Sequence, residues 1–88
     1  MTERNARIVN QLGLHARPAA QLVKLASVFQ AEIELEKDGM AVNGKSIMGV
    51  MMLAAECGST ITLRATGPDE ARAVDALLEL VAQGFGES

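Results

Sequence analysis

The sequence has one cysteine, Cys57, and no tryptophan or tyrosine, so Phe29 and Phe85 are its only large aromatic residues. A single cysteine excludes an intramolecular disulfide bond and favours a reducing, cytoplasmic location, and we expect its thiol to be buried. Two phenylalanines supply no platform for stacking bases. The eight basic residues are scattered along a chain of net charge -3, so we expect no nucleic-acid partner.

Long apolar runs are also missing. No segment is long and apolar enough to span a membrane, and the first residues lack the apolar stretch of a signal peptide. One histidine and one cysteine are too few ligands for a zinc site. What is present, 88 residues of which 49% are hydrophobic and 22% charged, is typical of a single small globular domain over residues 1–88.

Hydrophobic periodicity predicts short elements in the order strand, helix, strand, strand, helix, strand, helix. Residues 31–37 alternate apolar with acidic side chains, and Asp38-Gly39 is typical of a two-residue hairpin turn. Strands with one polar face predict an α+β fold, in which a four-stranded antiparallel sheet carries three helices on one face and is open to solvent on the other. The expected strands are 4–9, 31–37, 40–42 and 60–66, and the expected helices run from Pro18 to Phe29, from Ile47 to Ala55 and from Pro68 to Gly84.

The two longer helices each carry an apolar stripe that should face the core. The first stripe is Ala19, Leu22, Val23, Ala26 and Phe29, and the second is Ala71, Val74, Leu77, Leu78 and Val81.

The only histidine, His15, lies in the run Gly13-Leu14-His15-Ala16-Arg17-Pro18-Ala19, where the first predicted helix begins. The first backbone N–H groups of a helix lack partners and the helix dipole is positive there, so this end attracts anions. An imidazole at that place, two residues before a guanidinium, can act as a nucleophile whose product carries a phosphoryl group. A lone histidine is more often a surface or capping residue, so this hypothesis depends on the surrounding motif.

The segment after the hairpin combines an N-cap with a cluster of methionines. Ser46 is a good N-cap for the helix 47–55. Methionines at helical spacing are as often core as interface, but Met48, Met51 and Met52 lie too close together all to point inward. We expect them to form an exposed docking surface, because flexible thioethers repack against different partners at low cost. Ile47, Val50, Leu53 and Ala54 are then available to the core.

Together with residues 13–19, the run Lys45-Ser46-Ile47-Met48-Gly49-Val50-Met51 resembles the two signature segments of the HPr phosphocarrier family, which serves the bacterial phosphoenolpyruvate-dependent phosphotransferase system. The resemblance covers essentially the whole chain and implies an open-faced β-sandwich. It implies that His15 accepts a phosphoryl group on Nδ1 from enzyme I and passes it to enzyme IIA domains, while Arg17 pairs with the phosphoryl oxygens.

The resemblance also implies regulation and a partner surface. Ser46 would be phosphorylated by the HPr kinase/phosphorylase, where the host has one. Partners would dock on the second helix, and the start of the first helix would add Ala20, Lys24 and Ser27 to that contact; the second helix contributes Ile47, Met48, Met51 and Met52. The protein would be a monomeric carrier and not an enzyme, with protein partners and neither cofactor nor metal.

Three other interpretations stay open at this point. Thr66-Gly67-Pro68 with Gly84-Phe85 is reminiscent of the nitrogen-branch regulatory paralogue NPr, although the run 45–49 is more similar to the general carrier. A small acylphosphatase-like enzyme would need a glycine-rich phosphate loop, which residues 13–19 do not form. A non-catalytic interaction module would use only the methionine surface, with His15 incidental.

Overall fold

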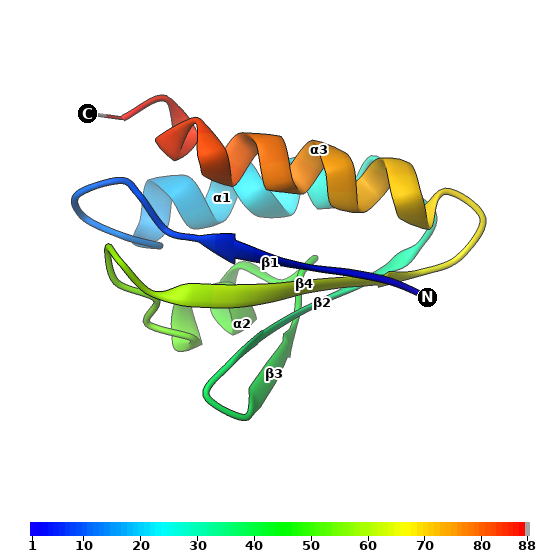
Figure 1. The fold of residues 1–88 in the computed structure, drawn as a ribbon, viewed down its shortest axis with the longest axis horizontal. Helices are drawn as coiled ribbons and strands as arrows, with labels where there is room; N and C mark the ends of the chain where they lie inside the picture. The colour runs from blue at the N-terminus through cyan, green and yellow to red at the C-terminus, as the bar shows by residue number, and fades with distance from the viewer. Residues whose placement is uncertain (88) are drawn as a thin grey trace.

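The computed structural model describes residues 1–87, and within them four strands form one sheet on which three helices pack (Figure 1). The elements in chain order are β1 (Thr2–Arg7), α1 (Ala16–Ala26), β2 (Glu32–Lys37), β3 (Met40–Asn43), α2 (Ile47–Met52), β4 (Thr60–Thr66), α3 (Glu70–Ala82) and a short 3₁₀ turn, η1 (Gly84–Gly86).

The sheet is antiparallel throughout and its strand order is β1-β4-β2-β3, so β4 and β2 lie in its centre. Alternate residues of the central strands are buried: Ile61, Leu63 and Ala65 on β4, with Ile33 and Leu35 on β2. The side chains between them face outward and are polar, which is the two-sided pattern that the sequence predicts.

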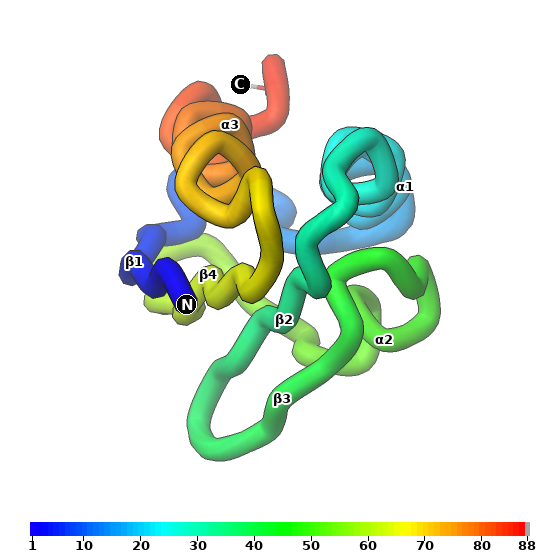
Figure 2. Tube along the Cα trace, turned by 90° about the vertical axis from the view of Figure 1, so that its right-hand side faces the viewer, coloured from blue at the N-terminus to red at the C-terminus, as the bar shows by residue number. Residues whose placement is uncertain are grey.

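The helices all lie on one side of the sheet (Figure 2). Buried residues from α1 and α3 fill the space above the strands, and Val50 of α2 joins the same core at the β3 end. The α+β open-faced sandwich is therefore confirmed. The residues that the helices bury are Pro18, Ala19, Leu22 and Ala26 from α1, Val50 from α2, and Ala73, Val74, Leu77 and Val81 from α3.

Several expected boundaries were wrong, and two helices end early because tight turns follow them. After Ala26, the chain changes to i→i+3 bonds, with the N–H of Val28 donating to the carbonyl of Leu25 at 3.1 Å, so α1 stops before Phe29. In the same way, α2 ends at Met52, and Ala54 takes the left-handed region at φ 50°. At the other end of the sheet, β1 begins at Thr2 and ends at Arg7.

Four predictions of side-chain burial were also wrong. Ile47, the first residue of α2, is exposed, and Ala54 is exposed because it follows the end of this short helix; Val50 and Leu53 of the expected core stripe are buried. On α3, which begins two residues after Pro68, Ala73 is buried and Ala71 is exposed. Cys57 lies on the turn before β4 and its thiol is exposed.

Two carboxylates tie the start of α3 to distant parts of the chain. Asp69 accepts backbone hydrogen bonds from Gln30 and Ala31, at 2.9 and 2.8 Å. Glu70 accepts bonds from the Thr2 hydroxyl at 2.7 Å and from the backbone N–H of Gly67 at 3.1 Å. Hydrogen bonds to the N-terminal ammonium group, to Thr2 and to Gly67 lower the pKa of Glu70 to about 2.

We predict that Glu70→Gln lowers the melting temperature at pH 7. The folded-state pKa of Glu70 is depressed, so its stabilisation is complete above its ordinary pKa of 4.5 and is lost as the pH falls from there through about 2. The difference in melting temperature between wild type and variant should therefore shrink over that interval, as measured by circular dichroism at a series of pH values. Asp75→Asn, an exposed position of the same helix, is the matched control and should show no such trend.

Candidate functional site

His15 occupies the N-cap position of α1, with extended backbone angles (φ −80°, ψ −171°) and its carbonyl accepting the first helical bond from Ala19 at 2.9 Å. The N–H groups of Ala16 and Arg17 have no hydrogen-bond acceptor within residues 1–87. Pro18 has no N–H, and its ring is buried. The start of α1 therefore presents two free backbone donors beside the imidazole.

The loop before His15 is fixed by close contact with the segment that follows α2. The N–H of Leu14 donates to the carbonyl of Ala55 at 2.9 Å. Gly13 has φ 69°, and a Cβ at this position would lie 2.4 Å from the same carbonyl oxygen. Only glycine fits there, because both the backbone angle and the space exclude a side chain.

A carboxylate that the sequence did not predict completes the site. Nε2 of His15 lies 3.0 and 3.1 Å from the two carboxylate oxygens of Glu87, 72 residues further along the chain. Asn10, whose side chain is buried, donates from Nδ2 to Oε1 of Glu87 at 3.0 Å and to the carbonyl of Gly13 at 2.8 Å. Hydrogen bonds from His15 and Asn10 lower the pKa of Glu87, and the charge of Arg17 lowers it further.

The remaining edge of the imidazole is free. The His15 side chain is 37% exposed, and its Nδ1 makes no hydrogen bond to any residue that the structure describes. Arg17 is exposed on the first turn of α1, and its guanidinium makes no ion pair with residues 1–87. The site can therefore offer a ring nitrogen, two backbone donors and a guanidinium to an incoming anionic group.

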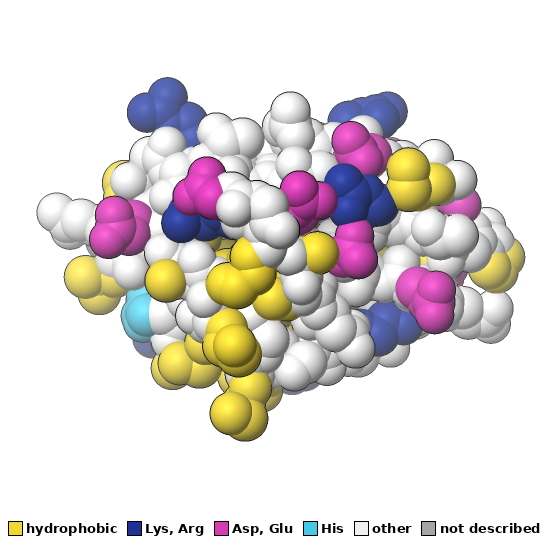
Figure 3. Space-filling view, turned by 90° about the horizontal axis from the view of Figure 1, so that it is seen from below, with side chains coloured by type: hydrophobic (Ala, Val, Ile, Leu, Met, Phe, Trp, Pro, Cys, Tyr) yellow, Lys and Arg dark blue, Asp and Glu magenta, His cyan; other side chains and the backbone are white. Residues whose placement is uncertain are grey.

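Ser46 is the N-cap of α2, as the sequence predicts, since its Oγ accepts a hydrogen bond from the N–H of Gly49 at 3.1 Å. Beyond it, Met48 is 76% exposed and Met51 and Met52 also lie on the surface. Figure 3 shows hydrophobic side chains gathered beside the histidine. The helices α1 and α2 pack against each other. We use the term α1–α2 surface for the exposed residues of these helices that the sequence predicts to contact partners: Ala20, Lys24, Ser27, Ile47, Met48, Met51 and Met52.

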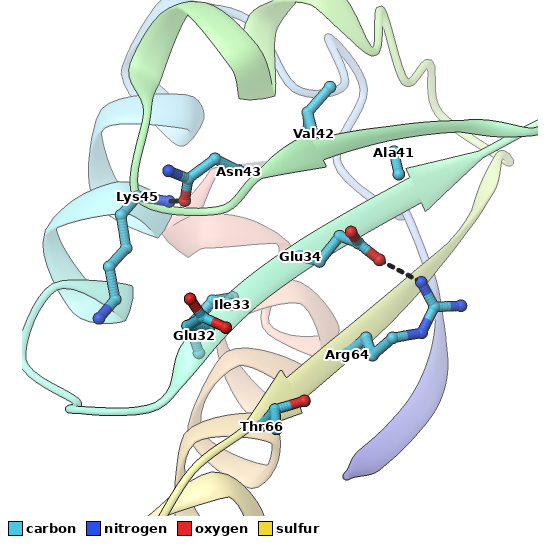
Figure 4. A pocket seen from close by; sticks show the side chains of 9 residues that line it. All are labelled: Glu32, Ile33, Glu34, Ala41, Val42, Asn43, Lys45, Arg64 and Thr66. Atoms are coloured by element: carbon cyan, nitrogen blue, oxygen red, sulfur yellow. Dashed lines mark hydrogen bonds and ion pairs between the residues drawn. The ribbon is translucent and has the colours of Figure 1, made fainter.

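The rest of the described chain has a pocket, but neither a metal site nor a membrane-spanning helix. A hollow of 470 Å³ is separate from His15 and lies over β2, β3 and β4, where Arg64 contacts Glu34 (Figure 4). Within residues 1–87, no group of three or more histidine, cysteine, aspartate or glutamate side chains could hold a metal ion. No helix in this range has the length and apolar character needed to cross a bilayer.

Comparison with known proteins identifies the family. The family model described as "PTS HPr component phosphorylation site" matches residues 2–83. The phosphocarrier protein HPr of Cupriavidus necator is 54% identical over 87 residues, covering 99% of this chain and 98% of that protein.

Solved structures agree. HPr from Thermoanaerobacter tengcongensis superposes with a TM-score of 0.96 at 48% identity, covering 100% of this chain and 99% of that one. A second structure, described as an HPr dimer from the same organism, gives a TM-score of 0.80 at 48% identity, covering 99% of this chain and 100% of that one. The chain belongs to the HPr family of phosphocarrier proteins of the phosphotransferase system.

Proposed function

We propose that this phosphocarrier accepts a phosphoryl group on Nδ1 of His15 from phosphorylated enzyme I and delivers it to enzyme IIA domains. One observation carries the proposal: the free Nδ1 of a partly exposed imidazole lies at the start of α1, beside two backbone N–H groups that have no acceptor in the described chain. A helix N-terminus with free donors favours a bound anion, and a phosphoryl group carries up to two negative charges.

The transfer is a balanced exchange of one bond. The lone pair of Nδ1 attacks phosphorus, the bond between phosphorus and the donor nitrogen of enzyme I breaks, and the donor imidazole recovers its lone pair. The reverse exchange at the IIA domain regenerates free His15. The protein is thus an intermediate of the relay and not an enzyme, and no cofactor or metal enters its part of the reaction.

Arg17 is assigned to the transferred group. Its guanidinium is exposed and makes no ion pair with the described residues, and its planar set of donors matches phosphoryl oxygens. Because it lies one turn or less from His15 at the positive end of α1, it can contact the group during transfer.

The α1–α2 surface is assigned to docking, because exposed thioethers adapt to partners of different shape. A carrier that must leave each partner quickly is best served by weak, transient interfaces and by a monomeric state in the cytoplasm. A related HPr structure is described as a dimer, so the oligomeric state of this protein should be measured. Sedimentation of the purified protein distinguishes a monomer from a dimer. We favour a role in sugar uptake over nitrogen-branch regulation, because the run 45–49 is more similar to the general carrier than to the nitrogen-branch paralogue.

Incubation with phosphoenolpyruvate, magnesium and a bacterial enzyme I should add one acid-labile phosphoryl group, detected by intact-mass analysis. His15→Ala should abolish the gain while still competing with wild type for enzyme I, because the docking residues are untouched. Arg17→Ala should slow transfer by roughly 10- to 100-fold, the effect of losing charge-assisted hydrogen bonds of about 1.5–3 kcal/mol.

Two outcomes would contradict this scheme. A wild-type protein that binds a cognate enzyme I without gaining mass would favour the interaction-module alternative. A phosphoryl group that survives acid and persists in His15→Ala would place modification elsewhere, with Ser46 as the first position to examine.

We also propose that Ser46 is a regulatory phosphorylation site for the HPr kinase/phosphorylase. Its partly exposed side chain caps α2 directly beside Ile47 and Met48, which are exposed. A phosphate there would set about two negative charges next to an apolar docking surface. Its effect would therefore fall on partner binding and leave the fold intact.

The pair Ser46→Asp and Ser46→Asn separates charge from capping. Aspartate and asparagine are both good N-caps, so both variants should keep α2 and differ only in charge. We expect Ser46→Asp to weaken binding to enzyme I, seen as a raised half-saturation concentration, while Ser46→Asn behaves as wild type. Ser46→Ala loses the cap and should lower the free energy of unfolding by about 1 kcal/mol in urea titrations. Equal binding by the Asp and Asn variants would contradict the charge mechanism.

A further inference from the structure

The C-terminal segment of the chain returns to the active histidine, although nothing in the relay described above uses it. We infer that Glu87 is a positioning residue, whose carboxylate holds the imidazole proton of His15 on Nε2 and so keeps the lone pair on Nδ1. The inference rests on the proposed function, because it explains how one ring nitrogen is prepared to receive the phosphoryl group.

The hydrogen-bond chemistry of the two groups fixes the direction of the contact. Both oxygens of Glu87 lie within 3.1 Å of Nε2, and an ionised carboxylate can only accept hydrogen bonds. The lowered pKa of Glu87 keeps this carboxylate ionised at neutral pH. A neutral imidazole has one donor nitrogen and one acceptor nitrogen, so Nε2 must be the donor. Nδ1 is then the nucleophile.

Glu87 is held in place by a segment that is itself packed. Gly84, Phe85 and Gly86 all have positive φ, at 65°, 57° and 74°, and this turn reverses the chain after α3. Phe85 is buried in the core, and the N–H of Glu87 donates to the carbonyl of Gly84 at 3.0 Å. The strained angle at Phe85 is tolerated because the buried ring anchors the turn.

Asn10 supports the carboxylate from the other side. Its side chain is 2% exposed, and its amide nitrogen bridges Glu87 and the carbonyl of Gly13. One buried amide therefore couples the position of Glu87 to the loop that carries His15. This arrangement aligns the acceptor before any partner binds.

The carboxylate also has a role once transfer begins. When the bond between Nδ1 and phosphorus forms, the proton remains on Nε2 and the ring gains positive charge. Glu87 then faces that charge across a charge-assisted hydrogen bond, which is stronger than the bond to the neutral ring. No proton has to enter or leave during the step, so the only bonds exchanged are those to phosphorus.

The test uses the ring nitrogens of His15 directly. Protein labelled with ¹⁵N at histidine is recorded at neutral pH, through correlations between the ring protons and both ring nitrogens, for wild type, Glu87→Gln and Glu87→Ala. We expect only the Nε2–H form in wild type, with its N–H proton protected from exchange with water. Both variants should lose that protection and show some Nδ1–H form, since water or an amide can pair with either tautomer. Glu79→Gln, an exposed carboxylate of α3, is the control and should match wild type.

Transfer from phosphorylated enzyme I is measured on the same proteins. Glu87→Ala should accept the group roughly tenfold more slowly at saturating enzyme I, the order of one charge-assisted hydrogen bond, with little change in half-saturation because docking is untouched. Backbone amide spectra are recorded to check that each variant is folded. If Glu87→Ala does not fold, the transfer rate is measured on Glu87→Gln, which keeps the size of the side chain.

The inference is overturned if the wild-type ring carries its proton on Nδ1, or if wild type and both variants give the same ring signals. It is also overturned if Glu87→Ala loses the protected proton yet accepts the phosphoryl group at the wild-type rate. Failure of the wild-type protein to accept phosphate would overturn the proposed function instead, and the ring signals alone would then decide the tautomer.

Discussion

The close approach of Gly13 to Ala55 is the contact on which the arrangement of this molecule depends. It joins the loop in front of α1 to the segment behind α2, so that the start of one helix and the exposed face of the other lie at the same end of the sheet. A side chain at position 13 would collide with a backbone oxygen, which cannot move without shifting the whole segment. The backbone segment that carries His15 and the α1–α2 surface are therefore placed together by backbone contact.

The part of the site that is local in sequence could be predicted from the sequence, and the part that depends on tertiary packing could not. His15 and Arg17 follow from the start of one helix, and the capping role of Ser46 follows from the start of another, because N-cap chemistry acts over three or four residues. Glu87 reaches His15 only through three consecutive positive φ angles, one of them at Phe85. A phenylalanine gives no sequence signal for that conformation, so the return of the chain could not be read from the pattern.

The errors in burial have a related physical cause. Periodicity specifies which residues share a helical face, but it does not specify where the helix stops. Because the left-handed turn at Ala54 follows so soon after α2, Ala54 stays on the surface. Ile47, the first residue of α2, is exposed as well, although both residues share the expected apolar stripe. Ile47 thereby joins the methionines on the α1–α2 surface, and the core loses little because Val50 and Leu53 are buried.

The distribution of polar contacts suits a carrier that must both take up and release a phosphoryl group. The hydrogen bonds within the site hold the imidazole and its loop: Glu87 accepts from His15 and Asn10, and Asn10 also donates to the carbonyl of Gly13. In the proposed function, the phosphoryl group would contact two backbone donors and one exposed guanidinium. Tight binding of the phosphorylated state would slow delivery as much as it aided acceptance, because only interactions that strengthen in the transition state accelerate transfer in both directions. In the proposed function, hydrogen bonds that hold the His15 ring, combined with few contacts to the phosphoryl group, would meet that requirement in a domain of 88 residues.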